Sequence, residues 1–200
     1  LYTMPGSTTL KDQQSKQLRL FEAQDVMYRR FYEVASYSED VQIVFEIHNN
    51  AENGLGMSFP AGNFKVYQRD DTDDGLTFIG EDAIVHTPKD ETIRLHIGEA
   101  FDLRCERKCL NKRRDRGVHQ EQWRITLKNH KAEPALIQVL HRVQESAVIE
   151  NASHSWEKRS ADEVMFEVEL LPDAVENIEF TVAVDERIHF IKQIEQGRTE

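Results

Sequence analysis

The feature that most constrains the fold of this 200-residue chain is a strict alternation of apolar and polar residues. An apolar side chain stands at every second position in VQIVFEIH (41–48), TIRLHIG (92–98), QWRITLKN (122–129), EVMFEVELL (163–171) and NIEFTVAVDE (177–186). Because successive side chains of a strand point to opposite faces, each segment predicts a strand with one dry and one wet face. That pattern is typical of antiparallel sheets.

Short polar turns separate these segments. They read NNAENG (49–54), DDTDDG (70–75), TPKDE (87–91), NHKAEP (129–134) and LPDAVEN (171–177). Many short strands divided by such turns favour an all-β fold, an antiparallel β-sandwich of immunoglobulin-like architecture with two lobes. Helix is an interpretation only for KDQQSKQLRLFEAQ (11–24) and RIHFIKQIEQ (187–196).

The longest charged, apolar-poor stretch, NKRRDRGVHQ (111–120), marks a soft boundary between the lobes. We therefore expect a first β-sandwich lobe over 1–115, a second over 116–190 and a tail over 191–200. The tip of a long hairpin inside one domain has the same composition, and the lobes are equally compatible with an interleaved order of strands.

A sharp turn is expected in LGMSFPAGNF (55–64) and the residues just before it. Gly54 and Gly56 supply positions of positive φ after the strand that ends near His48. Pro60 cannot stand in the middle of a sheet, and Gly62 begins the next strand.

The charge balance, 25 basic against 36 acidic residues, gives a net charge of −11 and argues against a nucleic-acid-binding protein. The sequence contains no apolar run of 18 residues, so no transmembrane segment is expected. The chain begins LYTMPGSTTL, without Met or a leader pattern, which we interpret as a fragment or a processed product.

Several motifs in order, LG, PAG, IGED, HTPKDE, IRLHIGEAFDL, LKNHKAEPA and a tryptophan before EVMFEVEL, resemble a mainly bacterial family of unknown function. It is the β-rich C-terminal part of proteins similar to mucoidy inhibitor A. The resemblance implies an upstream half, often with a coiled coil, and a periplasmic or cell-envelope location. It implies no catalytic residues.

The acidic turn DDTDDGLTFIGE (70–81) matches the spacing of a calcium loop. Asp70, Thr72 and Asp74 take positions 1, 3 and 5, Gly75 takes position 6 and Glu81 takes position 12. A solvated hairpin tip with an Asp-Gly turn explains the same residues without a metal.

A basic stretch follows, in ERKCLNKRRDR (106–116), and is a candidate contact for an anion or an acidic partner. The alternative interpretation is a charged connection between two strands. The basic residues are Arg107, Lys108, Lys112, Arg113, Arg114 and Arg116.

Other combinations of reactive residues are weaker candidates. Cys105 and Cys109 share a strand face but lie roughly 13 Å apart, too far for a disulfide. His86 and His96 come near each other across the TPKDE turn, but their register is not opposed, which does not favour a zinc site. The adjacent acids Glu81 and Asp82 point to opposite faces of one strand and cannot act as a pair.

Two further expectations concern structural roles. We expect Glu99 and Asp102 to accept hydrogen bonds from turn amides beside Gly98. Trp123 and Trp156 are expected to anchor the core or the contact between the lobes.

The function best supported by these patterns is a non-catalytic binding or scaffolding module that holds a protein or a cell-surface polymer. The alternative is a metal-assisted hydrolase that uses the acidic cluster at 70–81, with calcium as the possible cofactor. A third hypothesis is an assembly element whose edge strands pair between copies into a homo-oligomer.

Overall fold

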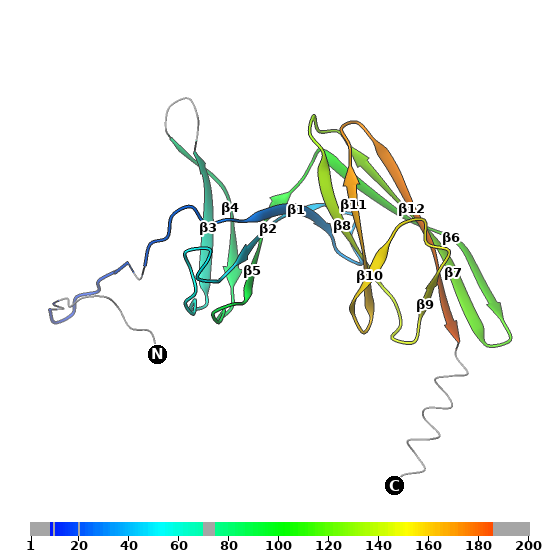
Figure 1. Cartoon of the computed structure of the whole chain (residues 1–200), viewed down its shortest axis with the longest axis horizontal. Coiled ribbons are helices and arrows are strands. Elements are labelled where there is room, and N and C mark those ends of the chain that lie inside the picture. Colours follow the sequence, from blue (N-terminus) through cyan, green and yellow to red (C-terminus); the bar gives the residue numbers. More distant parts are fainter. Residues whose placement is uncertain (1–8, 10, 20, 70–74, 186–200) are drawn as a thin grey trace, which may run out of the picture.

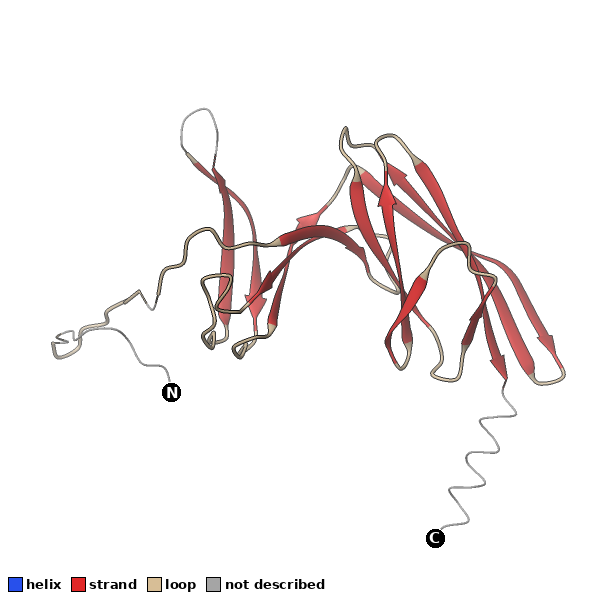
Figure 2. Cartoon of the chain, in the orientation of Figure 1, coloured by secondary structure: helices blue, strands red, loops and turns tan. Residues whose placement is uncertain are grey.

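The computed structural model describes residues 9, 11–19, 21–69 and 75–185, and within these ranges it is built of strands and loops without helix (Figure 2). The strands are β1 (Arg29–Val34), β2 (Gln42–His48), β3 (Gly62–Arg69), β4 (Leu76–Ile84), β5 (Thr92–Glu99), β6 (Leu103–Asp115), β7 (Val118–Asn129), β8 (Ala135–Arg142), β9 (Val148–Glu150), β10 (Trp156–Ser160), β11 (Glu163–Leu170) and β12 (Val175–Asp185). The all-β prediction is confirmed. No described segment forms a helix that would reach across a membrane.

The helix considered for 11–24 is wrong for the described part of that segment, which has no regular structure. Phe21 packs edge-on against Phe59, but most of the segment is polar and exposed, and a short helix is marginal in water without a buried apolar face. Residues 187–196 lie outside the described ranges.

The described residues form three sheets (Figure 1). One has six strands in the order β10-β11-β8-β1-β2-β5, one has four in the order β6-β7-β12-β9, and β3 pairs with β4 as a hairpin. Neighbouring strands are antiparallel except β1 and β8, which are parallel. The apolar face of the six-stranded sheet is covered by the other two sheets, giving a β-sandwich-like fold with two cores.

The larger core lies between the β8–β11 half of the six-stranded sheet and the four-stranded sheet. Its fully buried side chains include Ile125, Ile137, Phe166 and Phe180. The smaller core lies where β3 and β4 cover β2 and β5, around Leu95. The alternation seen in the sequence sends one set of side chains of each strand into these cores, which is the main driving force for the fold.

The two halves of the chain interleave. Strand β1 pairs with β2 through Arg29–Glu33 and with β8 through Tyr32–Val34, so one sheet passes through both lobes. The segment 111–120 is the end of the β6–β7 hairpin, closed by Arg116 and Gly117 at φ of 46° and 84°. A division at residue 115 therefore falls inside one sheet, and these residues match the hairpin-tip interpretation.

The turn before β3 is built as the sequence predicts. Gly54 and Gly56 have φ of 68° and 85°. A Cβ at Gly56 would meet the backbone nitrogen of Ala51 at 3.0 Å, so the position needs glycine for space as well as for φ. The buried side chain of Asn49 accepts from the Gly56 amide at 3.1 Å and donates to the Met57 carbonyl at 2.6 Å, which fixes the loop.

Candidate functional site

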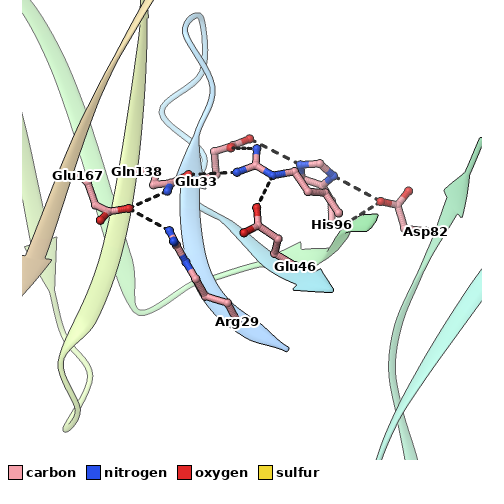
Figure 3. Close-up of polar contacts among 8 residues, drawn as sticks. Arg29, Glu33, Glu46, Asp82, His96, Gln138 and Glu167 are labelled. Atoms are coloured by element: carbon pink, nitrogen blue, oxygen red, sulfur yellow. Dashed lines mark hydrogen bonds and ion pairs between the residues drawn. The ribbon is translucent and has the colours of Figure 1, made fainter. Parts of the chain in front are cut away.

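The polar face of the six-stranded sheet, opposite its cores, carries a continuous network of charged side chains (Figure 3). It arises from the alternation: when one set of side chains enters the core, the other set of each strand shares the opposite face. In the register, Arg94 of β5 lies across from Glu46 of β2, and Glu46 lies across from Arg29 of β1. Opposite charges at facing positions stabilise such pairs.

Arg94 is the centre of this network. Its Nε donates to Glu46 Oε2 at 2.9 Å and its Nη1 to Glu33 Oε2 at 3.2 Å. The side chains of Glu33 and Glu46 are only 12% and 15% exposed, against 26% for Arg94. These ion pairs are therefore partly shielded from water. Charge–charge attraction is stronger in such a shielded environment than at an open surface.

An aromatic ring lies beneath the charges. Phe31 is fully buried but belongs to neither core, because it points to the polar face of the sheet. The guanidinium carbons of Arg29 and Arg94 lie 4.8 Å and 5.2 Å from the centre of its ring. Cation–π attraction to this ring thus helps to hold both guanidinium groups in place.

The network continues toward β11. Arg94 Nη2 donates to Gln138 Oε1 at 3.4 Å, and Gln138 Nε2 donates to Glu167 Oε2 at 2.7 Å. Arg29 Nη2 pairs with the same Glu167 oxygen at 3.0 Å. Each acidic group here is joined to a donor, so the face offers donors and acceptors in alternation with little net charge.

In the other direction the network reaches β4 through His96. Its Nε2 is 3.6 Å from Glu33 Oε1 and its Nδ1 is 3.4 Å from Asp82 Oδ2. The backbone N–H of His96 donates to the same Asp82 oxygen at 2.8 Å. Asp82 thereby fastens β4 to the exposed edge of β5.

A pocket of about 440 Å³ opens on this face beside the edge strand β10. Its lining combines three arginines, three glutamates and the half-exposed Trp156. The residues are Arg29, Glu46, Arg94, Gln138, Ser155, Trp156, Glu157, Arg159, Met165 and Glu167. Because the donors stand on paired strands, their positions are fixed before any ligand arrives, which lowers the entropic cost of binding.

The calcium-loop residues are only partly visible. Asp70, Thr72 and Asp74 lie outside the described residues. Glu81 stands within β4, across from Lys65 of β3. At a rise of 3.3–3.4 Å per residue, it lies about 17 Å along the strand from Leu76, where β4 begins. An extended strand does not return position 12 to the loop as a calcium site requires. Among the residues that the structure describes, no group of His, Cys, Asp and Glu is arranged to hold a metal.

The basic stretch 106–116 does not form one surface, which corrects the prediction for Arg107. Its guanidinium points between the sheets and donates to the carbonyls of Ser38, Ala35 and Leu140 at 2.9, 3.0 and 2.9 Å. Burial lowers the pKa of Arg107 below its usual value, and nearby Cys105 opposes this shift.

The remaining cations of that stretch lie on the long β6–β7 hairpin. Lys112 Nζ pairs with Glu121 Oε1 at 2.8 Å, and this hydrogen bond raises the pKa of Lys112. Arg113 pairs with Asp115 at 3.5 Å. Lys108, Arg114 and Arg116 are exposed. These groups remain a candidate contact for an acidic partner.

The other sequence expectations have mixed outcomes. The thiols of Cys105 and Cys109 are both free, as their spacing requires. His86 accepts from the Ala61 amide at 3.3 Å, whereas His96 contacts Glu33 and Asp82, so different partners hold the two rings. Glu81 is exposed while Asp82 is half-buried, which fits their predicted opposite faces.

Two structural roles need correction. Trp123 packs against the larger core as expected, but Trp156 is 41% exposed on edge strand β10 and anchors neither core. In the turn after Gly98, the Ala100 amide donates to the Val41 carbonyl and the Leu103 amide to the Ala100 carbonyl, in place of the expected bonds to Glu99 and Asp102. Backbone carbonyls are thus the acceptors for these two turn amides.

Sequence reasoning missed the network around Arg94. Its members come from strands far apart along the chain, and only the pairing register brings them together. The available signal was the polar half of each alternating segment, which contains Glu46, Arg94 and Glu167. No protein-family model, no curated protein and no solved structure matches this chain.

Proposed function

We propose that this chain is a non-catalytic binding module that holds a cell-surface polymer on the polar face of its six-stranded sheet. On the resemblance to proteins similar to mucoidy inhibitor A, it belongs to a larger envelope-associated bacterial protein. The observation that carries the proposal is the set of guanidinium, carboxamide and carboxylate groups fixed around the 440 Å³ pocket.

The chemistry of this set favours a ligand rich in hydroxyl groups. A hydroxyl donates one hydrogen bond and accepts others, so it fits a face where donors and acceptors alternate. Arg94 and Arg29 are already paired with carboxylates, which weakens their attraction for a polyanion. Neutral polysaccharide segments are therefore the preferred ligand class.

The proposal is tested by measuring the binding of neutral and acidic bacterial polysaccharides, presented on an array and then titrated in solution. Glu157 and Arg159 lie on the exposed edge strand β10 and line the pocket, so replacing both by alanine leaves the cores intact. We expect this double variant to bind at least tenfold more weakly.

The matched control is Glu169→Ala. Glu169 is an exposed acid on the neighbouring strand β11 and does not line the pocket. Its substitution should leave binding unchanged. Equal binding by the double variant and the wild type, or no binding of any polysaccharide at millimolar concentration, would refute the proposal.

A further inference from the structure

The smaller lobe is a strip of strands with two open ends. Strand β3 pairs with β4, β4 lies along β5, β5 pairs with β2, and β2 pairs with β1 (Figure 1). The contact between β4 and β5 is close, because the His96 amide donates to Asp82 and Gly80 lies against the Ile97 carbonyl. The strip curves around the smaller core, with β3 at one end and the beginning of β1 at the other.

A groove of about 950 Å³ lies between these two ends. One wall comes from β3, the other from the segment 23–28 and Arg30 at the beginning of β1, and the floor comes from β2 and β5. The lining residues are Ala23, Val26, Tyr28, Arg30, Ile43, Phe45, Ile47, Phe64, Lys65, Val66, Tyr67, Gln68, Ile79, Leu95 and Ile97. The floor is almost wholly apolar, yet Phe45 of the floor and Phe64 of the β3 wall are only partly buried, so the smaller core is incompletely covered.

Each wall carries a strand edge that is open within the described sheets. Strand β3 has β4 as its single neighbour. Residues 29–31 of β1 pair with β2 on one side, while pairing with β8 begins only at Tyr32. Open strand edges present N–H and C=O groups that an additional strand can pair with.

The charge of the groove is one-sided. Arg30 on the β1 wall and Lys65 on the β3 wall are its charged lining residues, and both are basic in a chain of net charge −11. Arg30 is held at the rim by the Tyr32 hydroxyl at 2.6 Å and by Glu133 at 3.5 Å. Arg30 pairs with Glu133 and Lys65 lies across from Glu81, but neither acid lines the groove, so the charged lining among the described residues favours acidic groups flanking an apolar segment.

We propose that this groove receives an extended, acidic strand of a partner protein, which pairs with the edge of β3 or β1 and closes the smaller lobe. Alternate apolar side chains of that strand lie on the partly buried Phe45 and Ile47, and its acidic residues lie near Arg30 and Lys65. Strand addition of this kind takes affinity from the main chain and specificity from alternate side chains. This site is separate from the polar face, so either proposal can fail alone.

The test begins with panning of random twelve-residue peptides on phage against the wild-type protein. We expect enriched peptides that alternate apolar residues and contain flanking acids. A synthetic copy of the most enriched peptide, measured by fluorescence anisotropy, should bind Lys65→Glu at least tenfold more weakly than wild type. In a paired strand, every second backbone N–H points toward its partner. Methylation of the nitrogens that point toward the edge should abolish binding, whereas methylation of the other set should leave binding unchanged.

The control is Lys89→Glu, which makes the same change of charge at an exposed lysine outside the groove, and it should keep wild-type affinity. No enrichment, or equal binding by Lys65→Glu, would overturn the proposal. Saturable binding of the fluorescent acyl chain cis-parinaric acid without peptide binding would assign the groove to a lipid instead. Self-association lost in Lys65→Glu would assign it to a second copy of this chain.

Discussion

Gly80 of β4 lies against the carbonyl group of Ile97 in β5 so closely that a Cβ atom at position 80 would come within 2.2 Å of that oxygen. The contact joins the β3–β4 hairpin to the six-stranded sheet without a regular ladder between β4 and β5. Only the absence of a side chain permits it.

Gly80→Ala is therefore expected to lower the free energy of unfolding by about 1–3 kcal/mol, the usual range for added volume in a packed site. Urea unfolding measures it. Gly62→Ala is the control, because a Cβ there meets nothing within 4 Å and should cost less than about 0.5 kcal/mol. Equal stability of the two variants would contradict the close approach of β4 and β5.

Arg94→Met is expected to destabilise the protein by about 2–3 kcal/mol, because it leaves the partly buried carboxylates of Glu33 and Glu46 without their cation. The exposed cross-strand pair Arg124–Glu179, at 2.7 Å, is the control. Arg124→Met should cost under about 1 kcal/mol. Equal losses in urea unfolding would show that the Arg94 pairs behave as ordinary surface ion pairs.

Much of the fold follows from the sequence because burial acts locally on each strand. The alternating segments 41–48 and 163–171 coincide with β2 and β11 to within a residue or two at each end. The two-residue turn at Arg116 and Gly117 was also within reach, since a glycine between two polar strands is typical of a hairpin. In β6 the charged residues hide the alternation of apolar and polar side chains. The end of the hairpin at 111–120 therefore resembles a boundary between two lobes in the sequence.

The candidate site could not be predicted in the same way. Alternation places Arg94 and Glu167 on polar faces, but it does not say which strands are neighbours. The parallel pairing of β1 with β8 joins residues more than a hundred positions apart, and it brings Gln138 between Arg94 and Glu167. Such pairings depend on the packing of whole sheets, which no local pattern encodes.

Arg107→Lys is expected to cost about 1–3 kcal/mol although the charge is kept. A single ammonium group does not reach the carbonyls of Ala35, Ser38 and Leu140 together as the planar guanidinium does, and unpaired buried carbonyls are costly. The neighbouring Lys108 is exposed on the other face of β6, so Lys108→Ala should change the midpoint of thermal unfolding little. A similar small shift for both would place Arg107 at the surface.

The two thiols are expected to react at very different rates. Burial raises the pKa of Cys105 to about 11, with the positive charge of Arg107 opposing the shift, so about a thousandth of it is thiolate at pH 8. Cys109 is only half-buried. Titration of the native protein with a colorimetric disulfide reagent should show one fast thiol, absent in Cys109→Ser, and a second only after unfolding. Two fast thiols would contradict the burial of Cys105.

His141 is expected to make the protein acid-sensitive below about pH 6.5. The residue is 7% exposed, and its ring packs edge-on against Trp123 and Phe180, at 5.0 Å and 4.9 Å between ring centres. Its pKa is lowered from 6.5 to about 4, chiefly by burial and also by the positive charge of Arg107, while Glu121 opposes the shift.

The unfolded chain binds a proton at this histidine near pH 6.5 whereas the folded protein does so only near pH 4. The contribution of His141 to the free energy of unfolding is therefore fully present above pH 6.5. It falls as the pH drops from 6.5 to 4, by about 3 kcal/mol in total at 1.36 kcal/mol per pH unit. His141→Gln keeps an acceptor near Arg107 but does not titrate. Its free energy of unfolding, measured in urea from pH 7 to pH 4, should fall less than that of the wild type. If the two proteins showed the same dependence on pH, His141 would bind a proton in the folded protein as readily as in the unfolded chain.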